Sequence, residues 1–300
     1  MYDWRVKALM NWIKLHLNSD GKLEMEKLAS AGHLDQYHYL GLQANDEVIR
    51  ILGLSPGMHV LDVGCGIGGP ARYMSWKSGA KFTGIDIQES LTSAGNLVSG
   101  LVGLEKDVHL ICGDVCVAAL DVKFDAFVSL LVILHIEDRT RLFSSLFDSL
   151  KPGGGFLIED MMSLSPFGPE ENDIAHNVIG TAKHLPNVSE YTQQLEAAGF
   201  VDIEFESLTP EWTRWCIDRS NQYTASKLDQ ITLHGEEIFA QRNHFYQQVK
   251  NLFESGKLGG VRITGRKPTL VETAIRNHRL RNRAQSDVNP VACILEKTVM

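Results

Sequence analysis

The stretch VLDVGCGIGGPARY, residues 60–73, holds the densest group of residues that could do chemistry. Four glycines, Gly64, Gly66, Gly68 and Gly69, follow a short apolar run, and glycine lets a backbone turn sharply and approach a ligand closely. An acid, Asp62, stands two residues before the first glycine. We expect a buried strand, a tight turn and the start of a helix, which together would bind a small-molecule cofactor.

Two classes of cofactor fit this glycine pattern. Gly64, Gly66 and Gly69 satisfy G-x-G-x-x-G, and Asp86 follows about 20 residues later, as in dinucleotide-binding sites. The carboxylate of Asp62, however, would repel a pyrophosphate and attract a cation. S-adenosylmethionine carries a sulfonium and an ammonium group and no phosphate, so it suits this loop better. A P-loop is excluded because no Lys-Ser or Lys-Thr follows the glycines.

The elements that must position this loop alternate along the chain. We predict strands at 58–63, 81–86, 107–112, 124–131 and 155–160, separated by helices that include 70–78, 89–102 and 138–150. Such alternation predicts a doubly wound parallel sheet. Ligands bind beyond the carboxyl ends of its strands, where Asp62, Asp86, Asp114 and His135 all fall.

Three segments carry a resemblance to a known family. VLDVGCGIGG resembles motif I of the class I S-adenosylmethionine-dependent methyltransferases. DQYHYLG and LLVILHIED narrow the resemblance to the group containing sarcosine/dimethylglycine and phosphoethanolamine N-methyltransferases, over roughly residues 33–160. The resemblance implies an α/β, Rossmann-like, doubly wound seven-stranded sheet. Its last strand, 259–266, would be antiparallel, and N-terminal helices and a helical lid would accompany it.

The resemblance also implies a cofactor, S-adenosyl-L-methionine, and the residues that hold it. Asp86 would accept hydrogen bonds from the ribose hydroxyls, and Asp114 would face the adenine amino group. The full predicted set is Asp62, Gly64, Gly66, Gly68, Asp86, Ile87, Asp114, Val115 and Leu130.

The methyl acceptor implied by the resemblance is a small amine, with a histidine and a tyrosine over its nitrogen. His135 stands where that histidine would be, and either Tyr37 or Tyr39 would be the tyrosine. A neutral imidazole can take the proton of an ammonium group, and a tyrosine hydroxyl can orient the nitrogen. The alternative for His135 is a capping or core histidine that bonds a backbone carbonyl.

The other end of the acceptor is less readable from the sequence. Arg214, Arg219 and Arg262 are candidates for binding a carboxylate, because guanidinium groups hold carboxylates with two parallel bonds. His38 is a further candidate substrate residue, and Lys183 with His184 could instead serve a phosphate. The sequence does not choose among them.

The predicted organisation has three parts. Residues 1–44 would be an N-terminal helical lid, with helices at 3–17 and 22–30. Residues 45–268 would form the cofactor-binding domain, interrupted by helical insertions at 161–186 and 210–254, the second an α-hairpin. Residues 269–300 would be a C-terminal tail without an assigned function.

Composition narrows the range of partners. A net charge of −8 and a pI of about 5.8 argue against a nucleic-acid substrate. No apolar run approaches the roughly 18 residues that span a bilayer, and no secretory signal is evident. Five cysteines without a C-x-x-C pair indicate a reducing, cytoplasmic location and no metal site. We expect a monomer or homodimer that acts on a small molecule.

Three other functions remain open. The aromatic-rich segment 210–254 could line an apolar pocket, which would fit methylation of oxygen or carbon on a hydrophobic acceptor. The chain could also be a cofactor-binding regulatory protein without catalysis, or a dinucleotide-dependent oxidoreductase.

Overall fold

The computed structural model describes residues 3–118, 120, 122–182, 184–276 and 278. Its strands are β1 (His59–Val63), β2 (Lys81–Asp86), β3 (Val108–Cys112), β4 (Phe124–Leu130), β5 (Leu150–Ser163), β6 (Val201–Ser207) and β7 (Leu258–Arg266). Its α-helices are α1 (Asp3–Lys14), α2 (Met25–Ala29), α3 (Leu42–Leu52), α4 (Gly69–Ser78), α5 (Glu89–Leu101), α6 (Arg139–Ser149), α7 (Pro169–Asp173), α8 (Val188–Ala198), α9 (Thr209–Ala225), α10 (Lys227–His234) and α11 (Glu236–Glu254). Shorter helical turns are η1 (Gly32–Leu34), η2 (Ile133–His135) and the π-helical η3 (Ile174–Ile179).

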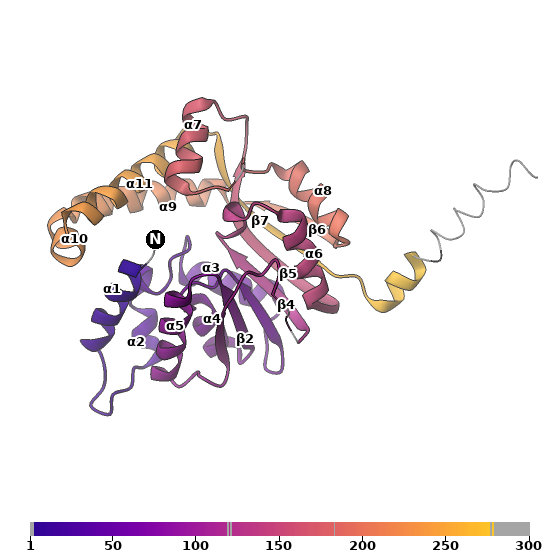
Figure 1. Cartoon of the computed structure of the whole chain (residues 1–300), viewed down its shortest axis with the longest axis horizontal. Coiled ribbons are helices and arrows are strands. Elements are labelled where there is room, and N and C mark those ends of the chain that lie inside the picture. Colours follow the sequence, from indigo (N-terminus) through magenta and orange to yellow (C-terminus); the bar gives the residue numbers. More distant parts are fainter. Residues whose placement is uncertain (1–2, 119, 121, 183, 277, 279–300) are drawn as a thin grey trace, which may run out of the picture.

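Within the described residues the strands form one seven-stranded sheet in the order β3-β2-β1-β4-β5-β7-β6 (Figure 1). The first five strands are parallel, and β7 runs antiparallel between β5 and β6. This confirms the predicted doubly wound sheet with an antiparallel last strand. The parallel register places the carboxyl ends of β1, β2, β3 and β4 at one edge of the sheet.

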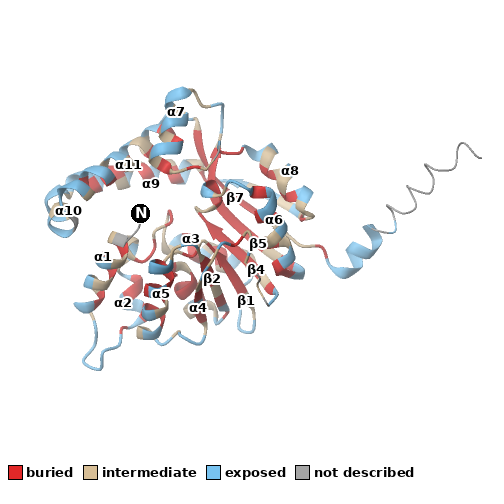
Figure 2. Ribbon diagram, in the orientation of Figure 1, coloured by how far each residue is buried: buried red, intermediate tan, exposed pale blue. Residues whose placement is uncertain are grey.

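Alternating side chains of β1 enter two separate cores. Leu61 and Val63 pack with Leu142 and Phe143 of α6 on one face, whereas Val60 packs with Met74 of α4 on the other. This two-residue period is that of a strand covered by helices on both faces. Figure 2 shows the buried residues concentrated on the strands, with α7 and α10 largely exposed. The glycine loop therefore follows a strand, β1, whose residues 60–63 are all buried.

The residues at the two ends of α4 explain where this helix begins and ends. It begins after Gly68, has Pro70 in its first turn, and ends at Gly79, which is left-handed with φ +73°. Proline fits a first helical turn because the amide there has no helical partner, and glycine is the usual C-cap. The predicted helix 70–78 is thus correct to within one residue.

Several predicted bounds were wrong. The strand predicted at 155–160 extends over Leu150–Ser163, because β7 pairs with it as far as Ser163. This extension takes the first residues of the predicted insertion 161–186, and α7 and η3 follow it. The predicted α-hairpin at 210–254 consists of three helices, with Gly235 at φ +86° between α10 and α11.

The N-terminal segment packs on the glycine loop. Leu9 and Ile13 of α1 and Leu28 of α2 share a core with Ile67 of the loop and Tyr73 of α4. This confirms the predicted amphipathic first helix, which ends at Lys14 and not at residue 17. Residues 277 and 279–300 of the predicted tail lie outside the described residues.

Candidate active site

The glycine loop between β1 and α4 leaves open space beside its backbone at Gly66, whereas Gly64 and Gly68 are closely packed by Val132 and Leu110. Gly66 has φ +53°, and a Cβ built on it would meet nothing within 4 Å. Its N–H donates to Oδ2 of Asp86 at 2.9 Å. Gly64 and Gly68 also have positive φ. The loop thus presents bare backbone next to a carboxylate at the end of β2, as a cradle for a ribose-bearing ligand requires.

Asp62 is a buried acid that lacks a partner. Its side chain is 3% exposed, and among the described residues nothing hydrogen-bonds its Oδ2 atom. Burial raises the pKa of Asp62 to about 8; the charge of Asp86 adds to this, and Arg72 opposes it. An orphaned buried carboxylate is costly unless a cation or donor meets it. The ammonium group of S-adenosylmethionine is such a partner, so this residue fits the cofactor.

Asp86 is held by the backbone on both sides. Its Oδ1 accepts from the N–H of Gln88 and its Oδ2 from that of Gly66, each at 2.9 Å. Each carboxylate oxygen keeps a further lone pair, so the fixed side chain can still accept from ribose hydroxyls. The next residue, Ile87, is 72% exposed, which leaves an apolar surface beside Asp86 for an aromatic base.

The remaining predicted cofactor residues lie at the ends of β3 and β4. Asp114 is exposed, and its Oδ1 accepts from the N–H of Cys116 at 2.8 Å. Val115 and Leu130 are buried apolar residues. The sheet thus brings the predicted cofactor residues to one edge, from β1 through β4.

His135 ends the short turn η2, which follows β4. Its Nδ1 lies 2.8 Å from the carbonyl oxygen of Gly180; since a carbonyl can only accept, Nδ1 carries the proton and Nε2 keeps a lone pair. The residue as a whole is exposed, but protein atoms around the ring shield it from water, and this desolvation lowers the pKa of the imidazole. The hydrogen bond to Gly180 raises the pKa and so partly offsets the shift. A neutral, oriented imidazole with a free acceptor nitrogen is suited to act as a general base.

Asp160, which the sequence reasoning missed, holds this turn in place. It is fully buried within β5, which continues to Ser163, and its Oδ2 accepts from the N–H of Leu134 at 3.0 Å. Its Oδ1 accepts from the N–H of Met161 at 2.7 Å. Burial raises the pKa of Asp160 to about 7, although the hydrogen bonds from the N–H groups of Met161 and Leu134 act to lower it. Its sequence signal was an acid that ends the apolar run FLIED.

The three aromatic and imidazole candidates of residues 37–39 point to different surroundings. Tyr37 is half-buried, with the guanidinium carbon of Arg5 3.8 Å from its ring centre. Tyr39 is 6% exposed and stacks on Trp215 at 4.4 Å; burial raises its pKa well above the ordinary value. Tyr37 is therefore the better placed of the two to meet a ligand.

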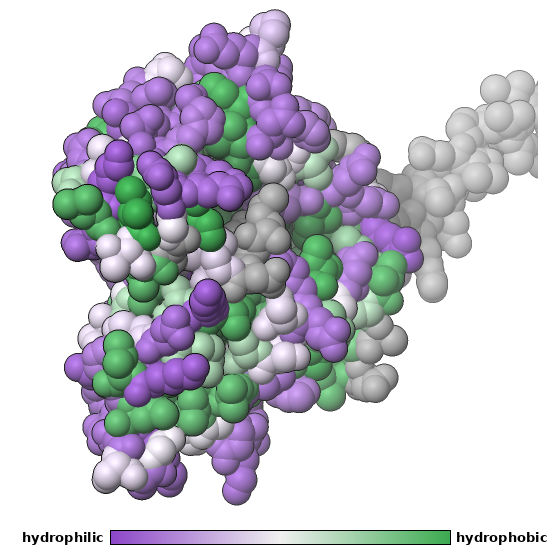
Figure 3. All heavy atoms as spheres, turned by 60° about the vertical axis from the view of Figure 1, so that its left-hand side comes forward, coloured by the Kyte–Doolittle hydropathy of each residue, from purple (hydrophilic) through white to green (hydrophobic). Residues whose placement is uncertain are grey.

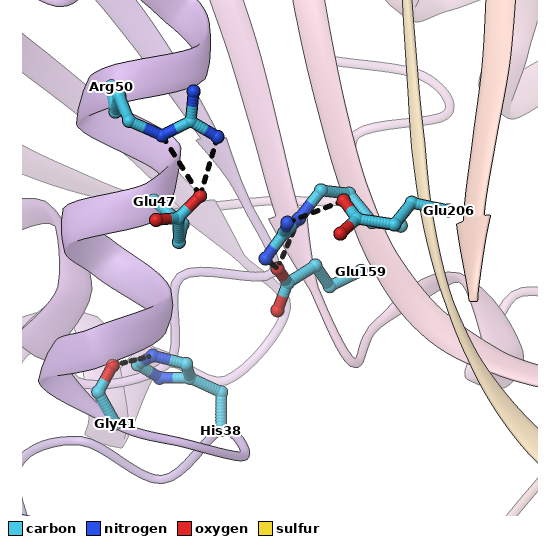
Figure 4. A network of polar contacts seen from close by, with 7 residues as sticks. His38, Gly41, Glu47, Arg50, Glu159 and Glu206 are labelled. Atoms are coloured by element: carbon cyan, nitrogen blue, oxygen red, sulfur yellow. Dashed lines mark hydrogen bonds and ion pairs between the residues drawn. The ribbon is translucent and has the colours of Figure 1, made fainter. Parts of the chain in front are cut away.

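His38 and Arg262, two of the predicted substrate residues, form hydrogen bonds with other parts of the protein. His38 is buried, donates from Nε2 to the carbonyl oxygen of Gly41 at 2.9 Å, and has its pKa lowered by burial to about 4 (Figure 4). Arg262 donates to Oε1 of Glu159 at 2.7 and 2.9 Å and to Oε2 of Glu206 at 2.7 Å. Arg262 and Nε2 of His38 thus bond within the protein, whereas Nδ1 of His38 is buried without a partner among the described residues. Their assignment to the substrate stays a prediction.

The other basic candidates differ in exposure, and Arg219 is partly buried on α9. Arg214 lies exposed on α9. His184 is exposed and contacts Glu190 at 2.9 Å, whereas Lys183 lies outside the described residues. None of these observations selects a group for the acceptor.

A buried ion pair joins the loop 32–41 to α4. Nη2 of Arg72 lies 2.7 Å from Oδ1 of Asp35, and both side chains are fully buried. Nη1 of Arg72 donates to the carbonyl oxygen of Gly95 at 3.1 Å. The sequence reasoning did not single out either residue. The pair thus links the segment that carries Tyr37 to α4, and a Cβ built on Gly69 would lie 2.0 Å from the carbonyl oxygen of Asp35.

The family model of the mycolic acid cyclopropane synthetases matches residues 41–263. The chain belongs to this family. A phosphoethanolamine N-methyltransferase of Arabidopsis thaliana is 34% identical over 223 residues, which is 74% of the chain and 42% of that relative. The chain thus spans less than half the length of the curated N-methyltransferases that it matches.

Two solved structures share the fold. Phosphoethanolamine N-methyltransferase 2 of Haemonchus contortus, in complex with phosphomonomethylethanolamine and S-adenosylhomocysteine, has a TM-score of 0.70 at 22% identity, covering 76% of this chain and 53% of that one. A Galdieria sulphuraria protein, proposed to be a sarcosine dimethylglycine methyltransferase, has a TM-score of 0.67 at 19% identity, with 76% and 86% covered. The resemblance to S-adenosylmethionine-dependent methyltransferases is confirmed.

Among the described helices, none is long and apolar enough to cross a membrane.

Proposed function

We propose that this chain transfers a methyl group from S-adenosylmethionine to the nitrogen of a small polar amine. The observation that carries the proposal is the buried, partnerless Oδ2 of Asp62 beside a glycine loop that is open at Gly66. It favours a cationic ligand over a pyrophosphate. The N-methyltransferase among the relatives supports the same reaction.

The residues divide into three roles. Asp62, Gly64, Gly66, Gly68, Asp86, Ile87, Asp114, Val115 and Leu130 would hold the cofactor, which supplies an electrophilic methyl group when bound. His135 would accept the ammonium proton of the acceptor at Nε2, because its Nδ1 is engaged by Gly180. Tyr37 would orient the amine, and Asp160 would position the turn that carries His135. Alignment and exclusion of water are the main contributions expected in such a displacement.

The predicted parts of the chain keep their proposed roles. Residues 1–44 would cover the cofactor as a lid, and residues 45–268 would form the catalytic domain. The segments 161–186 and 210–254 would enclose the acceptor, and a cytoplasmic location would suit an enzyme of small metabolites.

A label-transfer assay tests the proposal. Purified protein with labelled S-adenosylmethionine should methylate at least one member of a panel of ethanolamine, phosphoethanolamine, glycine and sarcosine. An unsaturated phospholipid and a sterol serve as comparison acceptors, since the family model is named for mycolic acid cyclopropane synthetases. Label only on lipid carbon would contradict the amine assignment. Tight binding of S-adenosylhomocysteine without any transfer would indicate a regulatory protein.

Cofactor affinity should depend on pH through Asp62. Because the free protein has this pKa raised to about 8, binding of a cation below pH 8 requires loss of a proton. The association constant for S-adenosylmethionine should therefore rise by about tenfold per pH unit from pH 6 towards 8 and then level off. Calorimetry in buffers of different ionisation enthalpy measures the proton released. Asp62→Asn should abolish this slope and Asp114→Asn should keep it; an equal slope in Asp62→Asn would contradict the assignment.

A further inference from the structure

A second group of polar side chains lies where α1 and η1 meet α9 and α11. We call it the arginine–tyrosine cluster, and its members are Arg5, His33, Tyr37, Arg219, Tyr223, Arg242 and Tyr246. Figure 3 shows the face on which these helices meet, with hydrophilic residues prevailing over its upper part.

The hydroxyl of Tyr246 is the centre of the cluster. It accepts from Nη2 of Arg242 at 2.5 Å and from Nη2 of Arg219 at 3.2 Å, and Nε2 of His33 lies 3.2 Å away. Nε of Arg242 donates to the hydroxyl of Tyr223 at 3.2 Å. Two guanidinium groups from different helices therefore converge on one neutral oxygen.

Arg219 and Arg242 carry positive charge without a matching acid among the described residues. Among the ion pairs of the described residues, none joins Arg219 or Arg242 to a carboxylate. Arg242 is 9% exposed, and Nε of Arg219 is buried without a hydrogen-bond partner. Burial and the charges of Arg219, Arg5 and Arg242 lower the pKa of His33. Guanidinium groups buried in this way normally meet an anion.

Aromatic rings complete the surroundings of the arginines. The guanidinium carbon of Arg242 lies 3.8 Å from the centre of the Trp4 ring, and that of Arg219 lies 5.1 Å from Tyr246. Such contacts hold a guanidinium in place while leaving N–H groups to donate. The fork of donors that remains suits an oxyanion with two or three acceptor oxygens.

The cluster borders the proposed methyl-acceptor site. His33 and Tyr37 flank Asp35, whose carbonyl oxygen contacts Gly69 of the glycine loop. Tyr39, in the same segment, shares a core with Leu134, the neighbour of His135. Trp215 of α9 lies between Tyr39 and the cluster. Its ring centre is 4.4 Å from that of Tyr39 and 5.9 Å from that of His33.

We propose that Arg219 and Arg242 bind an oxyanion carried by the methyl acceptor, with Arg5 and Tyr37 beside it. The acceptor would then be a zwitterion, an amine that bears a carboxylate or a phosphate a few bonds from its nitrogen. This proposal rests on the proposed function and adds the chemical class of the substrate.

The test compares Arg219→Met and Arg219→Lys with the wild type. Arg141→Met is the matched control, because Arg141 is an exposed arginine on α6 that does not belong to the arginine–tyrosine cluster. Methyl transfer is measured with ethanolamine, which has no anion, and with glycine and phosphoethanolamine. For the anionic acceptors we expect Arg219→Met to raise KM at least tenfold with a smaller change in kcat, and Arg219→Lys to restore part of the loss. Ethanolamine kinetics should stay the same, and the acceptor used best by the wild type distinguishes carboxylate from phosphate.

A second measurement does not depend on catalysis. Binding of inorganic phosphate and of acetate is followed by calorimetry, with S-adenosylhomocysteine affinity as the check that each variant is folded. Anion binding that weakens in Arg219→Met and Arg242→Lys but not in Arg141→Met supports the site, even if no amine is methylated. Equal anion binding in all variants would overturn it, even if amines are methylated. If Arg219→Met lowers thermal stability but leaves KM for the anionic acceptors unchanged, the proposed anion site would likewise be overturned. Arg219 would then only stabilise the packing of the helices.

Discussion

Replacing His135 with asparagine should lower kcat for the amine acceptor by about 10²-fold or more, since general bases contribute roughly this factor. Asparagine can still donate a hydrogen bond to the carbonyl oxygen of Gly180, which now accepts from Nδ1 at 2.8 Å, but it offers no basic nitrogen. The affinity for S-adenosylhomocysteine should not change. Steady-state kinetics and calorimetry give the two quantities.

The pH profile adds a signature that a structural role would lack. The pKa of His135 lies below its ordinary value. With S-adenosylmethionine saturating, so that its pH-dependent binding through Asp62 does not limit the rate, the wild-type kcat should fall on the acid side only below about pH 6.5. That limb should disappear in His135→Asn. His59→Asn is the control, because His59 is also a partly buried imidazole, bonded to Thr83 at 2.9 Å, at the amino end of β1. A His135→Asn enzyme with wild-type kcat would refute the assignment.

Removing the buried carboxylate of Asp35 should cost about 3–5 kcal/mol of unfolding free energy, because Arg72 would remain buried without its partner. Both side chains are fully buried, 2.7 Å apart. The loss should also weaken cofactor binding, since the segment around Asp35 lies on the glycine loop: a Cβ on Gly69 would come within 2.0 Å of the Asp35 carbonyl oxygen. Urea denaturation of Asp35→Ala measures the first effect and calorimetry the second.

An exposed ion pair supplies the control for Asp35. Arg50 and Glu47 are also 2.7 Å apart, but their side chains are 67% and 37% exposed. Glu47→Ala should therefore leave stability unchanged within error. The double variant Asp35→Leu with Arg72→Met should be more stable than Asp35→Ala, because no buried charge is left alone. Asp35→Ala with wild-type stability would show that the pair does not anchor this segment.

Local sequence patterns were enough to predict the sheet and the cofactor-binding loop. The apolar run before Gly64 could only be a buried strand, and Asp86 and Asp114 each follow a further run of that kind, so their shared edge followed from topology. His135 was found in the same way, as a polar residue just beyond β4. These residues need only the local chain and the strand order to be placed.

Contacts between segments that are distant in the sequence could not be predicted from such local patterns. The Asp35–Arg72 pair joins residues 37 positions apart, and Arg262 finds Glu159 across 103 positions. Nothing near Arg262 in the sequence distinguishes it from Arg219, yet β7 buries the first in a network of acids and α9 brings the second to Tyr246. Burial also differs between neighbours, as in Tyr37 and His38, and composition does not reveal which of the two side chains is the more exposed.

The most direct measurement of the central claim is a crystal structure with S-adenosylhomocysteine. We predict that its ammonium group meets Asp62, its ribose hydroxyls donate to Asp86, its adenine lies between Ile87 and Asp114, and its sulfur faces His135. A nucleoside bound elsewhere, or one whose sulfur points away from His135, would contradict the account.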